Sequence, residues 1–140
     1  MLRARYAASG ALAAISGLHV LWARGSSFPF ASGDALADAV VGSPAVPSSA
    51  ACLVVAGALA LASGLVAGLP VVPRPLRRPG IATVTAVLAV RGAVGLAGRT
   101  DLLSPSSASA RFRRLDRRCY APLCLALAAG SATALRGRPG

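Results

Sequence analysis

The chain has 140 residues, a net charge of +11 and 55% hydrophobic residues, but only 14% of its residues are charged. Because soluble domains carry about 25% charged residues, this composition excludes an ordinary soluble domain. The length leaves room for one domain, residues 1–140. All of the positive charge comes from 15 Arg, and the aromatic content is 4%. Such a surface is poorly suited to stacking on bases, so we expect no nucleic-acid partner.

Four long apolar runs divide the chain, and nearly all charged residues lie in the joints between them. The runs cover about residues 6–23, 46–69, 81–96 and 120–135. Each approaches the ~20 apolar residues that a helix needs to cross a ~30 Å hydrocarbon core. Helices satisfy their backbone groups internally, as a lipid environment requires. The sequence therefore predicts an all-α fold, a four-helix transmembrane bundle with up-down topology, in the cell membrane.

The first run follows a basic start that contains Arg3 and Arg5. A basic start before an apolar core is also typical of a secretory signal peptide. This run is long, however, it ends in Trp22 and Arg24, and three more candidate spans follow it. We therefore expect the first helix to be retained.

The joint at residues 24–45 is rich in Gly, Ser and Pro and contains Asp34 and Asp38. Its segment DALADAVVG predicts a short amphipathic helix that lies at the interface with both carboxylates on one face. Pro44 and Pro47 mark the beginning of the second span, since proline suits the first turn of a helix.

Within the second run, small residues recur at three- or four-residue spacing: Gly57, Ala60, Gly64 and Gly68. In lipid, a seam of small residues lets two helices approach closely. Residues 70–80, which contain four prolines and three arginines, end this span and predict a tight, solvent-facing turn.

The third run carries Arg91 inside it, and the joint at residues 97–119 ends in a strongly basic half, RFRRLDRRC. There we expect Phe112 and Leu115 to dip into the interface while the arginines face headgroups. Each arginine beside an anionic membrane surface contributes ~1 kcal/mol to the attraction between the protein and that surface. The expected partners are therefore the lipid bilayer and, through the Arg-rich joints, its anionic headgroups.

The predicted topology places both termini on one side of the membrane. The arginines outside the spans divide seven against seven between the two sides, so their number does not decide the orientation. The amino end of the first helix carries two arginines and the terminal amine, whereas its carboxyl end is followed by one arginine. Because the first helix usually dominates, we expect cytoplasmic termini.

The three cysteines do not form a disulfide framework. Cys52 lies inside the second run, where we expect it to act as a small buried hydrophobic residue. Cys119 and Cys124 are separated by four residues, unlike the two-residue gap of common zinc motifs, and the chain has one His. We therefore expect no metal, no cofactor and no catalytic residue set.

Two polar residues within the spans, His19 and Arg91, need an explanation, because a charge at the bilayer centre costs at least ~2.5 kcal/mol. The first and third spans run in the same direction, and both residues lie ~8 Å below the same surface. Asp116 and Tyr120 enter the fourth span from that surface, and Trp22 follows His19 by one turn. The topology therefore predicts a polar cluster of these five residues, with Arg91 within salt-bridge reach of Asp116.

Three interpretations of this cluster remain open. In the first, Arg91 and Asp116 form a structural staple between helices. In the second, Arg91 snorkels to the interface while Trp22 and Tyr120 belong to an aromatic belt. In the third, His19 faces an open cavity and the cluster binds a ligand or a substrate.

The same residues carry a resemblance to a known family. The segments GLHVLWARGSSFP, VRGAVGL and RFRRLDRRCYAPLCLAL resemble, in the same order, motifs of small bacterial membrane proteins called domain-of-unknown-function family three-nine-nine-five. The resemblance implies a four-helix membrane protein and brings no activity with it. The matching residues are His19, Trp22, Gly25, Arg91, Gly92, Phe112, Asp116, Tyr120, Pro122, Leu123 and Cys124.

The sequence leaves three functions to compare. The first is a non-enzymatic accessory or small-ligand-binding protein of the membrane. The second is a membrane enzyme that acts on a lipid or quinone-like substrate, with His19 as proton carrier and Arg91 as anion clamp. The third is a small oligomeric transporter. The sequence contains no metal-ligand set and no phosphate-binding loop, which favours the first function.

Overall fold

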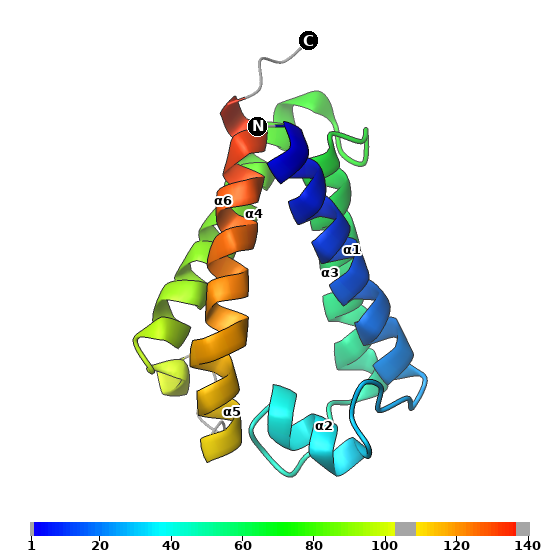
Figure 1. Ribbon diagram of the computed structural model, residues 1–140. Helices are drawn as coiled ribbons and strands as arrows, with labels where there is room; N and C mark the ends of the chain where they lie inside the picture. The colour runs from blue at the N-terminus through cyan, green and yellow to red at the C-terminus, as the bar shows by residue number, and fades with distance from the viewer. Residues whose placement is uncertain (1, 103–108, 137–140) are drawn as a thin grey trace.

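The computed structural model describes residues 2–102 and 109–136, and within these ranges every regular element is a helix (Figure 1). Four helices are long and apolar enough to cross a membrane, which confirms the predicted all-α four-helix transmembrane bundle. They are α1 (Leu2–Ala23), α3 (Ser49–Ala67), α4 (Arg74–Leu96) and a fourth long helix over Ala110–Arg136.

The fourth long helix has three parts, which are α5 (Ala110–Leu115), the π-helical segment η2 (Asp116–Tyr120) and α6 (Ala121–Arg136). Two short helices complete the described chain. The predicted amphipathic helix is confirmed as α2 (Gly33–Val40), and a 3₁₀-helix, η1 (Thr100–Leu102), follows α4. Consecutive long helices run in opposite directions, as the up-down topology predicts (Figure 1).

The long helices form two antiparallel pairs, α1 with α3 and α4 with α6 (Figure 1). The pairs meet at the end of the molecule where α1 begins and α6 ends. There a Cβ atom on Gly130 would lie 2.7 Å from the Cβ of Ala8 and 3.0 Å from the carbonyl oxygen of Ala4, so α1 and α6 are in close contact. The pairs diverge toward the opposite end of the bundle, and α2 lies at that end (Figure 1).

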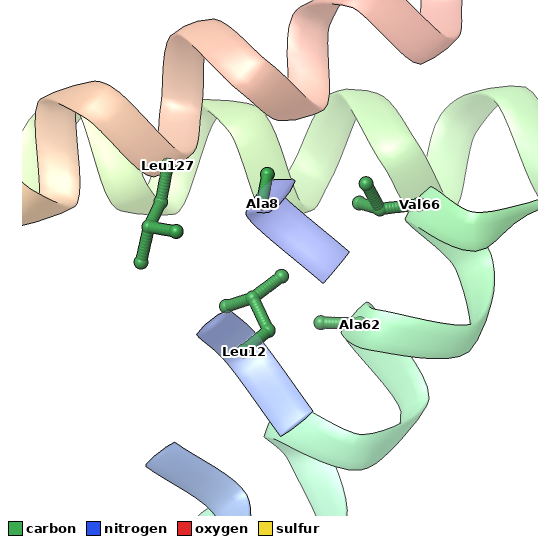
Figure 2. Packing of buried hydrophobic residues seen from close by; sticks show 5 residues of the cluster. All are labelled: Ala8, Leu12, Ala62, Val66 and Leu127. Atoms are coloured by element: carbon green, nitrogen blue, oxygen red, sulfur yellow. The ribbon is translucent and has the colours of Figure 1, made fainter. Parts of the chain in front are cut away.

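The hydrophobic core lies where three of the long helices approach one another. Figure 2 shows its buried side chains from α1, α3 and α6, with Leu12 between the other two helices. The cluster consists of Ala8, Leu12, Ala62, Val66 and Leu127. Its two alanines, Ala8 and Ala62, let the backbones approach closely, as in other membrane helix interfaces.

Serine side chains join α1 to α3 within the apolar spans. The hydroxyl of Ser16 donates a hydrogen bond of 2.8 Å to the carbonyl of Ala56, and that of Ser9 donates one of 3.0 Å to the carbonyl of Ser63. Interhelical hydrogen bonds of this kind are worth about 0.6 kcal/mol on average in a membrane protein. The two serines are seven residues apart and therefore lie on the same side of α1.

The predicted small-residue seam of the second span meets α1 at its far end, where a Cβ atom on Gly68 would collide with the guanidinium of Arg5. Gly57 and Ala60 are exposed, and a Cβ on Gly57 would meet nothing within 4 Å. Gly64 is buried, but it packs against Val71 of the following turn. Most of the seam is therefore not a helix interface within the described chain, because small residues recur on several sides of this helix.

Glycines set the distance between α4 and α6. A Cβ atom on Gly92 would lie 2.6 Å from the Cγ of Leu125 and 2.9 Å from the carbonyl oxygen of Ala121. A Cβ on Gly95 would lie 2.8 Å from the Cβ of Ala121. Both glycines are buried, so a larger side chain at either position would force the two helices apart.

The turn predicted at residues 70–80 is shorter than expected, because α4 begins at Arg74. Pro73 occupies the N-cap and Pro75 lies in the first turn, where a helix does not use the backbone N–H. Pro79 lies inside the helix. Pro73, Pro75 and Pro79 therefore belong to the beginning of the third span, and only Pro70 lies in the turn before its N-cap.

Two arginines near this turn bind the last carbonyls of α3. Arg5 Nε donates a hydrogen bond to the carbonyl of Val66, and Arg77 Nη2 donates one to the carbonyl of Gly68. Each bond is 2.5 Å long. The final carbonyls of a helix have no partner within it, and positive charge there is favourable. These arginines therefore stabilise the fold in addition to making this end of the molecule basic.

The basic half of the third joint is helical and belongs to the fourth long helix. Ser109 caps this helix, because its hydroxyl accepts a hydrogen bond of 3.0 Å from the backbone N–H of Phe112. Phe112 is 5% exposed and packs inward, whereas the sequence predicted it at the membrane interface. The helix contains 27 residues and is therefore about 40 Å long.

We expect Gly92→Val to destabilise the protein by about 1–3 kcal/mol, the usual effect of overpacking, because the new side chain collides with the backbone of α6. Gly57→Val is the matched control, since it makes the same exchange at an exposed helical site. Thermal unfolding in detergent should show a lower midpoint for the first variant only. Equal midpoints for the two variants would contradict the close α4–α6 contact.

Candidate functional site

The structure pairs the buried charge of the third span with that of the fourth. Arg91 Nη2 lies 2.5 Å from Asp116 Oδ1, and the Asp116 side chain is only 1% exposed. This contact confirms the predicted proximity of the two residues. Arg91 is 30% exposed and lies one to two turns before the end of α4. A buried carboxylate without a partner would be very unfavourable, so the ion pair compensates the buried charge and joins α4 to η2.

Gly95 provides the space that this ion pair occupies. A Cβ atom on Gly95 would lie 2.8 Å from Arg91 Nη1 and 2.8 Å from Asp116 Oδ2. These two atoms are buried and have no hydrogen-bond partner among the described residues. Gly95 follows Arg91 by one helical turn, which is why the absence of its side chain opens this space.

The π-helical segment directs three residues of the fourth long helix to one side. Four residues of an α-helix rotate about 40° beyond a full turn, and a wider π-turn, with less rotation per residue, compensates for that drift. As a result, Phe112, Asp116 and Tyr120 share a side of the helix although they are spaced four residues apart. The Phe112 and Tyr120 rings lie 6.4 Å apart.

This side of the fourth long helix holds α2. The hydroxyl of Tyr120 donates a hydrogen bond of 3.1 Å to the carbonyl of Ala39. Gly42, just after α2, has φ of 77°, and a Cβ there would lie 2.9 Å from the ring of Phe112. Arg111 Nη1 lies 3.6 Å from Asp38 Oδ2 in a largely exposed ion pair. These contacts, together with a backbone hydrogen bond of 3.2 Å from the N–H of Ser109 to the carbonyl of Gly42, fix the position of α2.

His19 and Trp22 lie on the other helix pair, near the end of α1. Their rings are 4.7 Å apart. His19 Nδ1 lies 2.8 Å from the carbonyl oxygen of Ile15, and Trp22 Nε1 donates a hydrogen bond of 2.7 Å to the carbonyl of Phe28. Gly25, with φ of 89°, ends this segment in a conformation that favours glycine.

The structure thus divides the five residues of the predicted cluster into two groups. Arg91, Asp116 and Tyr120 connect α4, the fourth long helix and α2. His19 and Trp22 make their hydrogen bonds within α1 and the loop after it, as far as the described residues show. The two helix pairs diverge at this end, so equal depth in the membrane does not bring the groups into contact (Figure 1).

A partly enclosed cavity of about 210 Å³ lies beside His19 and Trp22. Its walls come from α1, α2, α3 and the segments that connect them. The wall is mostly apolar, and it includes Leu36, Val55 and the buried Cys52. Because α2 provides one wall, the contacts of the fourth long helix with α2 also determine the shape of this cavity.

Tyr120 and Phe112 were singled out from the sequence, but their contacts with α2 were not predicted. The Ala39 carbonyl carries no recognisable signal, because a backbone acceptor leaves no trace in the residue type. The signal that existed was the spacing of Phe112, Asp116 and Tyr120, which places them on one side of a helix. Among the described residues, no group of three or more His, Cys, Asp or Glu side chains could hold a metal ion.

These features define a helical protein with four membrane-length spans, a buried ion pair between two of them and a cavity bounded by a short helix. Residues 12–131 match the family described as Protein of unknown function (DUF3995), and the chain belongs to this family. The match includes the five residues of the predicted cluster. No curated protein and no solved structure matches the chain.

A double-mutant cycle tests the ion pair. Arg91→Leu should destabilise the protein by about 3 kcal/mol or more, because it leaves the Asp116 charge buried without a partner. Asp116→Asn should have a smaller effect, since Arg91 is partly exposed and can extend toward the interface. The double variant should be more stable than the sum of the two effects predicts, as measured by unfolding in detergent. Strict additivity would show that the two residues do not interact.

Proposed function

We propose that this protein is a non-enzymatic membrane protein that binds a small amphipathic molecule in the cavity beside α2. The observation that supports this proposal is the cavity of about 210 Å³ lined by His19 and Trp22. An apolar wall with a few polar groups is typical of a small-molecule site. His19 and Trp22 both belong to the motif on which the family resemblance was based.

The size of the cavity limits its ligand. An engineered apolar cavity of about 150 Å³ holds one benzene molecule. A cavity of about 210 Å³ therefore suits a molecule with one or two fused rings, or the ring end of a longer lipid. The Trp22 ring offers an aromatic surface on which such a ligand can stack.

His19 determines which polar group the ligand carries. A carbonyl oxygen only accepts hydrogen bonds, so the contact with Ile15 uses an N–H at Nδ1. A neutral imidazole has one N–H, which leaves Nε2 as an acceptor. The ligand that fits best therefore donates a hydrogen bond, as a hydroxyl group on an aromatic ring does.

The contacts of Arg91 favour binding over catalysis. In the enzyme hypothesis, this residue holds an anionic group of the substrate near His19. Arg91 is instead paired with Asp116 on the other helix pair, which removes the support for that role. We accordingly propose no catalytic residue and no cofactor.

We also propose that the protein lies in the cell membrane with its termini on the cytoplasmic side. The four membrane-length helices support membrane insertion. Arg3 and Arg5, in the first turns of the first span, support the orientation. Reporter fusions at both termini should then be active only as cytoplasmic reporters, and activity as external reporters would contradict the orientation.

2-Naphthol and naphthalene are suitable probes, because they differ only in a hydroxyl group. In nanodiscs at pH 8, with empty nanodiscs as the reference, the protein should bind 2-naphthol about fivefold more tightly than naphthalene. This preference corresponds to one hydrogen bond of about 1 kcal/mol. His19→Phe should abolish the preference and retain naphthalene binding.

Two variants of α3 provide the control for the cavity itself. Val55→Trp should prevent binding of both probes, because Val55 lines the cavity and the larger side chain fills it. Val54→Trp makes the same exchange at the neighbouring, 72% exposed residue and should leave binding unchanged. Equal binding by wild type and both variants would show that the probes do not occupy this cavity.

A further inference from the structure

A second hollow lies outside the fourth long helix, on the side away from α2. Its volume is about 620 Å³, and it is open and strongly basic. Four arginines from two successive turns line it together with the end of α4. The described lining residues are Leu96, Gly98, Arg113, Arg114, Arg117 and Arg118.

Helical spacing explains why these arginines lie together. Arg113 and Arg117 are four residues apart, as are Arg114 and Arg118, so each pair lies on one side of the helix. The other side is occupied, because Asp116 contacts α4. The rotation of the helix about its axis that brings Asp116 to Arg91 therefore also turns these arginines outward.

The protein provides little negative charge to neutralise this surface. Arg114, Arg117 and Arg118 are exposed and have no hydrogen bond or ion pair with the described residues. The nearby Asp116 is paired with Arg91, and Asp38 is paired with Arg111. Like charges one helical turn apart repel each other, so a bound anion would relieve this repulsion.

We propose that this hollow binds the headgroup of an anionic phospholipid. Guanidinium groups bind phosphate oxygens through paired hydrogen bonds. The fourth long helix is about 40 Å long, whereas the hydrocarbon core is ~30 Å thick, so its first turns extend to the headgroup level. The arginines in these turns therefore lie where lipid phosphates are found.

The apolar surface beside the arginines identifies the ligand as a lipid rather than a free phosphate ion. Leu96 lines the hollow and is 42% exposed. Val90 and Ala93 of the same helix are also exposed and continue this surface toward the middle of the membrane. A phospholipid fits both parts, with its phosphate among the arginines and an acyl chain along α4.

The test compares two triple variants that carry the same change in charge. The site variant combines Arg114→Gln, Arg117→Gln and Arg118→Gln. The control variant combines Arg3→Gln, Arg74→Gln and Arg136→Gln, which are exposed arginines at the opposite end. Each variant lowers the net charge from +11 to +8, since three positive charges are removed.

Native mass spectrometry of protein released from nanodiscs measures the retained lipid. Wild type and the control variant should retain phosphatidylglycerol in preference to phosphatidylcholine. The site variant should bind phosphatidylglycerol at least tenfold more weakly than wild type. Equal losses in both variants would show an effect of net charge alone. Equal retention of the two lipids by wild type would also overturn the proposal.

Two further measurements use the wild-type protein, so they do not depend on the folding of a variant. The first distinguishes a lipid headgroup from free phosphate, and the second locates the lipid. Inorganic phosphate at a concentration equal to that of the headgroups should not displace the lipid, and full displacement would show a site for soluble anions instead. Photoactivatable phosphatidylglycerol should label wild-type peptides that contain Leu96 or residues 113–118. Labelling elsewhere alone would overturn the proposed location.

Discussion

The buried ion pair between Arg91 and Asp116 is the interaction on which the arrangement of this protein depends. A carboxylate that is 1% exposed within a membrane-length helix needs a positive partner, and Arg91 is the one it contacts. This requirement fixes the rotation of the fourth long helix about its axis. Gly95 makes the rotation possible, because a side chain at this position would collide with both charged groups.

The rotation of this helix has consequences on both of its sides. On one side, Phe112 and Tyr120 face α2, and their contacts with Gly42 and the Ala39 carbonyl hold that short helix in place. Because α2 forms a wall of the cavity beside His19, the ion pair and the cavity are connected through one element. On the other side, four arginines come together next to Leu96. A single buried contact thus positions the two surfaces for which we propose ligands.

The sequence was sufficient to predict the four spans and the ion pair, but not the full length of the third and fourth helices or the helix faces that meet. Length and apolar composition identify a membrane-crossing helix, and alternating direction places Arg91 and Asp116 at one depth. Which side of each helix is buried does not follow in the same way, because nearly every side of a membrane span is apolar. The seam of Gly57 and Ala60 was assigned to an interface for this reason, although both residues are exposed.

Hydrogen exchange in α2 tests most directly whether the ion pair holds the rest of the structure. Among the described residues, Arg91 and Asp116 bond to each other and not to α2, so any effect must pass through the fourth long helix. We predict that Arg91→Leu accelerates amide exchange over Gly33–Val40, whereas Arg74→Leu, the same exchange at an exposed position of α4, does not. Unchanged exchange in α2 of a folded Arg91→Leu protein would contradict this account.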